Sequence, residues 1–170
     1  MRLLGDPCLR EKSKPVKAVG PVERMLIAAM FETMDAYKGI GLAAPQVGVN
    51  EQIFVVDTGK DAFAVINPKI LKGTGQDKTE EGCLSIPNLQ VNITRAKSID
   101  VEFMDENNHI VRARLSGMVA KVFQHEYDHL QGKLIVDYLS VAEQKKILKE
   151  IKDGVFTGEG EHARVGAEKI

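Results

Sequence analysis

The sequence has little net charge and few aromatic residues. Its 170 residues include 23 Lys and Arg against 24 Asp and Glu, and aromatic residues make up 5%, with no tryptophan. Basic patches with interleaved aromatic residues, which are typical of nucleic-acid-binding proteins, are missing. We therefore expect no specific nucleic-acid binding.

Long apolar runs are missing as well. The longest fall well short of the roughly 20 residues that cross a bilayer, and the first residues lack the apolar core of a signal peptide. We therefore expect no membrane partner and a cytoplasmic location.

The hydrophobic content is sufficient for one sizeable core. Hydrophobic residues make up 44% of the chain, and the sequence contains neither a repeat nor an interdomain linker. We expect a single domain over residues 1–152. A polar, glycine-rich tail without helical periodicity is expected over residues 153–170.

The most informative motif is an H-E-x-x-H sequence. On a helix, His125 and His129 project from the same face, close enough to bind one metal ion, and Glu126 lies beside them. Met118 and Val122 continue the same inward-facing stripe. A lone buried histidine is more often structural, but two at this spacing around a glutamate favour a metal-hydrolase centre.

Two histidines hold a catalytic metal poorly, so a third protein ligand is required, with one position left open. Soon after the motif the chain offers only Asp137, whereas upstream Cys83 lies in E-G-C-L-S-I-P, a rigid turn that could present a thiolate. A lone cysteine is more often a small buried side chain, but beside an incomplete metal site Cys83 is the leading candidate. Thiolate binding requires a reducing compartment, and the other cysteine, Cys8, is interpreted as structural.

A third unusual segment, residues 39–48, is rich in small residues. It begins with G-I-G-L-A-A, which imitates a dinucleotide-binding fingerprint. However, helical periodicity precedes it and Pro45 interrupts any helix after it, which reverses the order that such a site needs. Small residues followed by the single amide of Gln46 suit a cleft wall with one placed hydrogen-bond donor.

The segments G-I-G-L-A-A-P-Q, E-G-C-L-S and Q-H-E-Y-D-H-L, in this order, resemble the peptide deformylase family. The resemblance runs from about Asp6 to the helix after Ser140, which is most of the chain. It implies an enzyme that removes the formyl group from the N-terminal N-formylmethionine of newly synthesised polypeptides and releases formate. It also implies nascent polypeptides as partners and a transient contact with the ribosome.

The resemblance implies roles for individual residues. The implied metal ligands are Cys83, His125 and His129. Glu126 would be the catalytic acid and base, and Gln46 with the backbone N–H of Leu84 would stabilise the oxyanion. The family commonly uses Fe2+, and Zn2+, Ni2+ or Co2+ is found in prepared enzymes.

The predicted substrate pocket beside the metal is apolar. The residues expected to line it are Ile40, Gly41, Leu84, Met118 and Val122. Such a pocket suits the unbranched, adaptable side chain of methionine. Many family members carry an arginine three residues after the proline of the cysteine motif, where this chain has Gln90. We also expect Glu81 to pair with Arg95 and to brace the cysteine turn.

Hydrophobic periodicity predicts an α+β fold. Helical patterns cover residues 21–38, and a capping box of Ser140 and Glu143 begins a helix that continues to residue 151. The expected strands, paired in two hairpins with one solvated face, are residues 52–57, 62–67, 98–104 and 109–115. The family fold, antiparallel β-sheets around a central helix that carries the H-E-x-x-H motif, agrees with this pattern.

Two other functions share part of this signal. A zincin-like metallopeptidase would use Glu126 and both histidines of the motif but would need neither Cys83 nor Gln46. A non-catalytic metal-binding module would need a fourth ligand. For that role the sequence offers only His109, expected to be exposed at a hairpin end, and His162 in the predicted tail.

Overall fold

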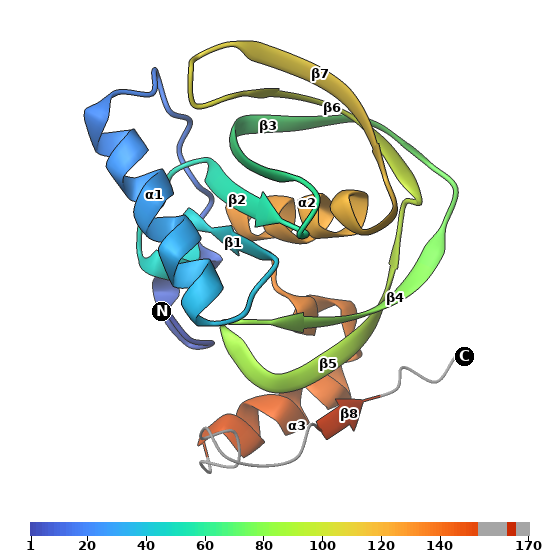
Figure 1. The fold of residues 1–170 in the computed structure, drawn as a ribbon. Helices are drawn as coiled ribbons and strands as arrows, with labels where there is room; N and C mark the ends of the chain where they lie inside the picture. The colour runs from blue at the N-terminus through green and yellow to red at the C-terminus, as the bar shows by residue number, and fades with distance from the viewer. Residues whose placement is uncertain (153–162, 166–170) are drawn as a thin grey trace.

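Two β-sheets and a central helix organise the chain (Figure 1). The computed structural model describes residues 1–152 and 163–165. The elements are η1 (Pro7–Arg10), α1 (Pro21–Ala36), β1 (Gly41–Ala43), η2 (Ala44–Val47), β2 (Ile53–Asp57), β3 (Ala62–Thr74), β4 (Asp77–Cys83), β5 (Ile86–Arg95), β6 (Ser98–Met104), β7 (Ile110–Ser116), α2 (Gly117–Leu130), η3 (Ile135–Tyr138), α3 (Val141–Lys152) and β8 (Ala163–Val165).

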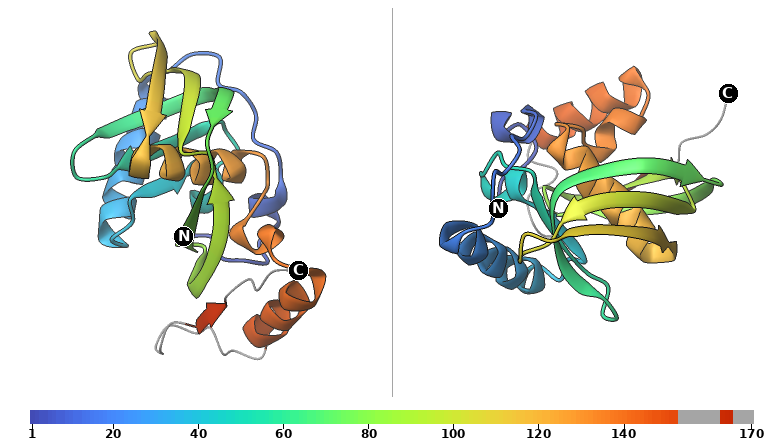
Figure 2. Two further views of the ribbon diagram at one scale, coloured as in Figure 1. Left: turned by 90° about the vertical axis from the view of Figure 1, so that its right-hand side faces the viewer. Right: turned by 90° about the horizontal axis from the view of Figure 1, so that it is seen from above.

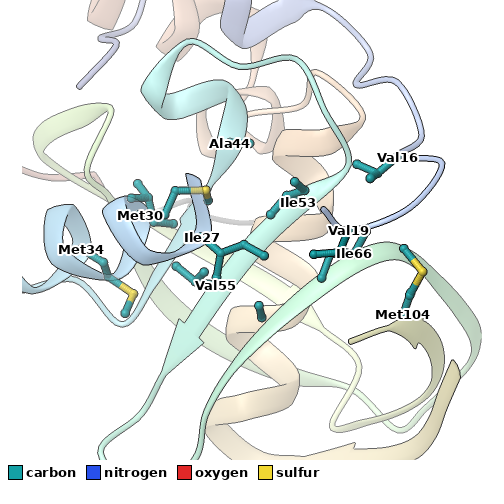
Figure 3. Close-up of a cluster of buried hydrophobic side chains, with 12 residues drawn as sticks. Val16, Val19, Ile27, Met30, Met34, Ala44, Ile53, Val55, Ile66 and Met104 are labelled. Atoms are coloured by element: carbon teal, nitrogen blue, oxygen red, sulfur yellow. The ribbon is translucent and has the colours of Figure 1, made fainter. Parts of the chain in front are cut away.

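The larger sheet has the strand order β1-β2-β3-β6-β7; β2 is buried on both faces, whereas β6 and β7 have one solvated face, as expected. β2 is a continuous apolar run because its residues pack alternately against α1 and α2. Ile53 and Val55 face the cluster that α1 builds, shown in Figure 3. Phe54 instead packs edge-to-face on Phe123 of α2, with ring centroids 5.0 Å apart. Seen from above, α2 passes beneath β6 and β7 (Figure 2).

The smaller sheet has the order β4-β5-β8. Leu89, Val91 and Ile93 alternate along β5 and are buried against η3 and Ile147 of α3. β4 and β5 are antiparallel, whereas β5 and β8 are parallel. The predicted α+β class with antiparallel sheets around the helix that carries H-E-x-x-H is confirmed, apart from this one parallel pair.

Several predicted boundaries need correction. The first helix ends at Ala36, before residue 38, and β3 continues to Thr74, well past the predicted end at residue 67. The segment 81–87 was expected to be a rigid turn; the turn itself is residues 84–85, and Cys83 is the last residue of β4 in a hairpin with β5. The predicted capping box is present, since the Glu143 carboxylate accepts a hydrogen bond from the Ser140 backbone N–H at 2.8 Å.

The division into a domain over residues 1–152 and a tail over 153–170 stays a prediction. α3 ends at Lys152, and residues 163–165 form β8, a strand that the sequence did not suggest. Residues 153–162, with His162, and residues 166–170 lie outside the described part. Among the described helices, none is both long and apolar enough to cross a membrane.

The row Ile66–Met104–Ile110 runs across three paired strands and offers a matched test of burial. Ile66 is fully buried, whereas Ile110 is 65% exposed. Ile66→Ala should lower the free energy of unfolding by about 2 to 5 kcal/mol, because it removes buried methyl groups and leaves a cavity. Ile110→Ala should change it by less than about 0.5 kcal/mol. Urea denaturation would measure both, and equal losses would contradict the core assignment.

Candidate active site

The structure brings the three predicted metal ligands together. His125 and His129 lie on α2, and Cys83 reaches them from the end of β4. One ligand atom from each lies within 4.8 Å of the other two. The Cys83 Sγ is 3.3 Å from Nε2 of His129. The helix therefore presents both imidazoles to a strand end that is far away in sequence.

These donors fit a divalent transition metal. One thiolate and two imidazoles are the soft and borderline ligands that Fe2+ or Zn2+ prefers, and three ligands leave a position open. Nδ1 of His125 lies 2.9 Å from Glu81 Oε2, which leaves its Nε2 for an ion. The exposed His109, whose side chain is 76% accessible, lies outside this cluster, as expected.

Buried charges set the electrostatics of the site. Burial alone would lower the pKa of His125, but hydrogen bonds with Cys83 and Glu81 and the charge of Glu126 outweigh it and raise this pKa well above its usual value. The surroundings of His125 therefore favour a positive charge, which a bound metal ion would supply in place of the Nε2 proton. Burial and the neighbouring cations His125 and Arg95 hold the pKa of His129 well below its usual range. Burial raises the pKa of Glu126 to about 7, although His125 opposes the shift.

Glu126 lies against the backbone of Gly41. The side chain is 3% exposed, and its Oε2 has no hydrogen-bond partner among the described residues. A Cβ built on Gly41 would clash with Oε1 of Glu126 and would lie 2.7 Å from Val122 Cγ1. Only glycine permits this close approach of β1 to α2.

The orientation of the Gln46 amide is fixed by its neighbours. Its Oε1 accepts a hydrogen bond from the Ala43 backbone N–H at 2.8 Å, and its Nε2 donates to Ser85 Oγ at 3.1 Å. The same Nε2 is 3.6 Å from Cys83 Sγ. The amide N–H group therefore faces the ligand cluster, as the sequence suggested. Ser85, which fixes it, was not predicted.

A pocket of about 980 Å³ opens beside the ligand cluster. All five predicted pocket residues line it: Ile40, Gly41, Leu84, Met118 and Val122. One expectation was wrong, because Met118 is 55% exposed and does not lie on the buried stripe of α2. It belongs to the first turn of that helix. Gln90 also lines the pocket, as do Tyr37 and Lys38, which sequence reasoning missed.

The predicted pair of Glu81 and Arg95 is confirmed. Arg95 is 5% exposed and binds Glu81 through two nitrogens, Nε at 2.8 Å and Nη2 at 2.9 Å. Two unpredicted partners extend the pair: Arg95 Nη1 donates to Asp128 Oδ2 at 2.6 Å and to the Tyr138 hydroxyl at 2.8 Å. Both cysteines are free, and the Cys8 thiol contacts the carbonyl of Pro45.

Known proteins are similar to this sequence over most of its length. Residues 1–145 match the model of the family described as polypeptide deformylase. The chain belongs to the peptide deformylase family. The peptide deformylase of Thermotoga maritima is 44% identical over 154 residues, which are 90% of this chain and 94% of that protein. Members of the family are metal-dependent hydrolases, which agrees with the cysteine and histidine cluster.

Solved structures of the family have the same fold. The crystal structure of peptide deformylase from Thermotoga maritima is 46% identical, covers 82% of this chain and 96% of its own, and has a TM-score of 0.80. The peptide deformylase from Ehrlichia chaffeensis in complex with actinonin is 34% identical, covers 91% and 95%, and has a TM-score of 0.87.

The ligand cluster predicts one bound divalent ion per chain. Alanine at Cys83, His125 or His129 should each weaken metal binding by more than the roughly 10- to 100-fold that is typical of changes around a ligand. Metal content after equilibration with buffered Zn2+ or Co2+ would measure this. His109→Ala, which removes an exposed histidine, is the control and should retain the metal. Full occupancy in Cys83→Ala would show that the third ligand is wrong.

Proposed function

We propose that this chain removes the formyl group from the N-terminal N-formylmethionine of newly synthesised polypeptides and releases formate. The observation that carries the proposal is the Glu126 carboxylate, buried at the wall of a large pocket beside Cys83 and two histidines. Membership of the peptide deformylase family supports it. Because nascent chains would be the substrate, we place the activity in the cytoplasm, in transient contact with the ribosome.

Cys83, His125 and His129 would hold the metal ion, which we propose to be Fe2+, with Zn2+, Ni2+ or Co2+ as replacements. A thiolate and two neutral imidazoles would leave a divalent ion with a net charge of about one, which suits Fe2+ or Zn2+. When bound, such an ion polarises a carbonyl oxygen and lowers the pKa of water toward neutrality.

The groups around the ligand cluster would carry out proton transfer and stabilise the oxyanion. Glu126 would accept a proton from the water molecule while the oxygen of that water bonds to the formyl carbon. The negative charge that develops on the formyl oxygen would be stabilised by the Gln46 amide and the Leu84 backbone N–H, which follows Cys83 in the pocket wall. Glu126 would then return the proton to the leaving nitrogen as the C–N bond breaks, which leaves formate and a free amino group.

The sheet edges suit an extended peptide. β1 and β4 are each the first strand of their sheets, and residues of both line the pocket. Their outer edges can offer backbone hydrogen bonds to a peptide that lies between them. The apolar wall at Leu84 and Val122 would then receive the methionine side chain, while Gly41 leaves room for a formyl group that carries only hydrogen.

A zincin-like metallopeptidase is the second candidate. It would share Glu126 and the two histidines, but it would not require a cysteine in the ligand cluster or a fixed amide at Gln46 beside it. These two features favour deformylation.

Glu126→Gln should separate metal binding from catalysis. The side chain is not a proposed ligand, so the metal content should be unchanged, whereas kcat should fall by roughly a hundredfold or more because the proton acceptor is lost. Glu106→Gln makes the same change at an exposed position and should leave kcat unchanged. Steady-state kinetics with formyl-Met peptides, together with metal analysis, would decide. An unchanged kcat would remove Glu126 from the mechanism.

Substrate choice should follow the shape of the pocket. A misplaced methyl or methylene group in such a site costs about 1 to 3 kcal/mol, so acetyl-Met peptides should have a kcat/KM at least roughly tenfold below that of formyl-Met peptides. Formyl-Asp peptides should also be poor, because the pocket would bury their charge. Equal values for formyl-Met and formyl-Asp would contradict the pocket assignment. Cleavage of internal bonds in unformylated peptides would instead favour the metallopeptidase.

A further inference from the structure

A connected set of hydrogen bonds leads from the proposed metal ligand His125 to Tyr138 in η3. His125 Nδ1 lies 2.9 Å from Glu81, which Arg95 binds through two nitrogens. The third nitrogen of Arg95, Nη1, donates to both Asp128 and the Tyr138 hydroxyl. The hydroxyl donates its single proton to Asp128 Oδ2 at 2.6 Å. Arg95, Asp128 and Tyr138 therefore form a closed ring of three hydrogen bonds.

The Tyr138 hydroxyl makes two of the three bonds in this ring. Its removal would leave Arg95 Nη1 with Asp128 alone and would leave Asp128 with one donor fewer. The aromatic ring is held separately, since the guanidinium carbon of Arg95 lies 5.0 Å and the Lys133 Nζ lies 3.6 Å from its centroid. Replacing tyrosine by phenylalanine would thus remove the hydroxyl and keep the packing of the ring.

Three of the five members of the network do not line the substrate pocket. Glu81 and His125 line that pocket, but Arg95, Asp128 and Tyr138 are not among its lining residues. A change at the Tyr138 hydroxyl can reach the metal ligands through Arg95 and Glu81, and hence through the orientation of His125, or through Asp128, which directly precedes His129. Partners of metal-binding histidines fix the ring orientation and the position of the ring proton.

We propose that Tyr138 is a positioning residue for the metal centre: its hydroxyl, together with Asp128, fixes Arg95, which holds Glu81 against His125 Nδ1. Four separate elements, β4, β5, α2 and η3, meet in this network. Arg95 and Tyr138 are the two members of the network that come from elements without a proposed metal ligand. The proposal rests on the metal centre described under Proposed function.

The test compares Tyr138→Phe with Tyr127→Phe, a neighbouring residue on α2 that takes no part in the network. Dissociation constants for Zn2+ and Co2+, measured by competition with a chromophoric chelator, should rise about tenfold in Tyr138→Phe, the lower end of the range for such partners. The visible absorption of the Co2+ form should change, because the ligand geometry relaxes. The KM for a formyl-Met peptide should stay within about twofold of the native value, since the pocket is untouched. Tyr127→Phe should match the native protein in all three.

Identical metal affinity and identical Co2+ spectra in the two variants would overturn the proposal. A raised KM with unchanged metal binding would also overturn it, because Tyr138 would then act on the substrate. If Tyr138→Phe does not fold, Asp128→Asn breaks the same ring of hydrogen bonds. Native metal binding in Asp128→Asn would then overturn the proposal. These readouts need no turnover: a native protein that binds no metal would overturn the metal centre itself, whereas native-like binding in Tyr138→Phe would overturn only the role of Tyr138.

Discussion

The buried guanidinium of Arg95 connects the parts of the chain that carry the metal ligands. Glu81 lies two residues before Cys83, and Asp128 lies one residue before His129. Without a cation between them these two carboxylates would repel each other. Taking one arginine out of water costs several kcal/mol, and close geometry with several hydrogen bonds is needed to offset that cost. Arg95 makes these hydrogen bonds with Glu81, Asp128 and Tyr138. β4 and α2 can therefore hold their metal ligands on either side of one site.

This arrangement also determines the state of His125. Burial would raise the pKa of Glu81, but the hydrogen bonds from Arg95 and His125 outweigh it and lower that pKa, so the carboxylate stays ionised. An ionised Glu81 accepts a hydrogen bond from the Nδ1–H of His125, which leaves the lone pair of Nε2 for a metal. The geometry of one ligand thus depends on a charge that Arg95 maintains.

The residues of the candidate site could be predicted from the sequence more fully than the strands that hold them. The H-E-x-x-H spacing, the small residues before Gln46 and the pairing of Glu81 with Arg95 were all visible, because each depends on local spacing or on complementary charge. β4 was missed because its sequence, D-K-T-E-E-G-C, is charged and lacks apolar alternation. β5 does alternate at Leu89, Val91 and Ile93, but Pro87 near its start is typical of a turn. The contribution of Tyr138 depends on tertiary contacts that no sequence spacing reveals.

The apolar packing of α2 explains how such a charged site is tolerated. Phe123 and Val122 pack into the core below the larger sheet, where the contact between Phe54 and Phe123 fixes the helix. His125 and Glu126 lie one turn after Val122, beside this apolar packing, and their burial is unfavourable unless they are paired or hydrogen-bonded. The hydrophobic burial of Phe123 and Val122 therefore offsets the cost of burying these groups on the same helix. For this reason the Glu126 carboxylate can be kept buried against Gly41 with one oxygen that has no hydrogen-bond partner among the described residues, which is the condition a proton acceptor needs.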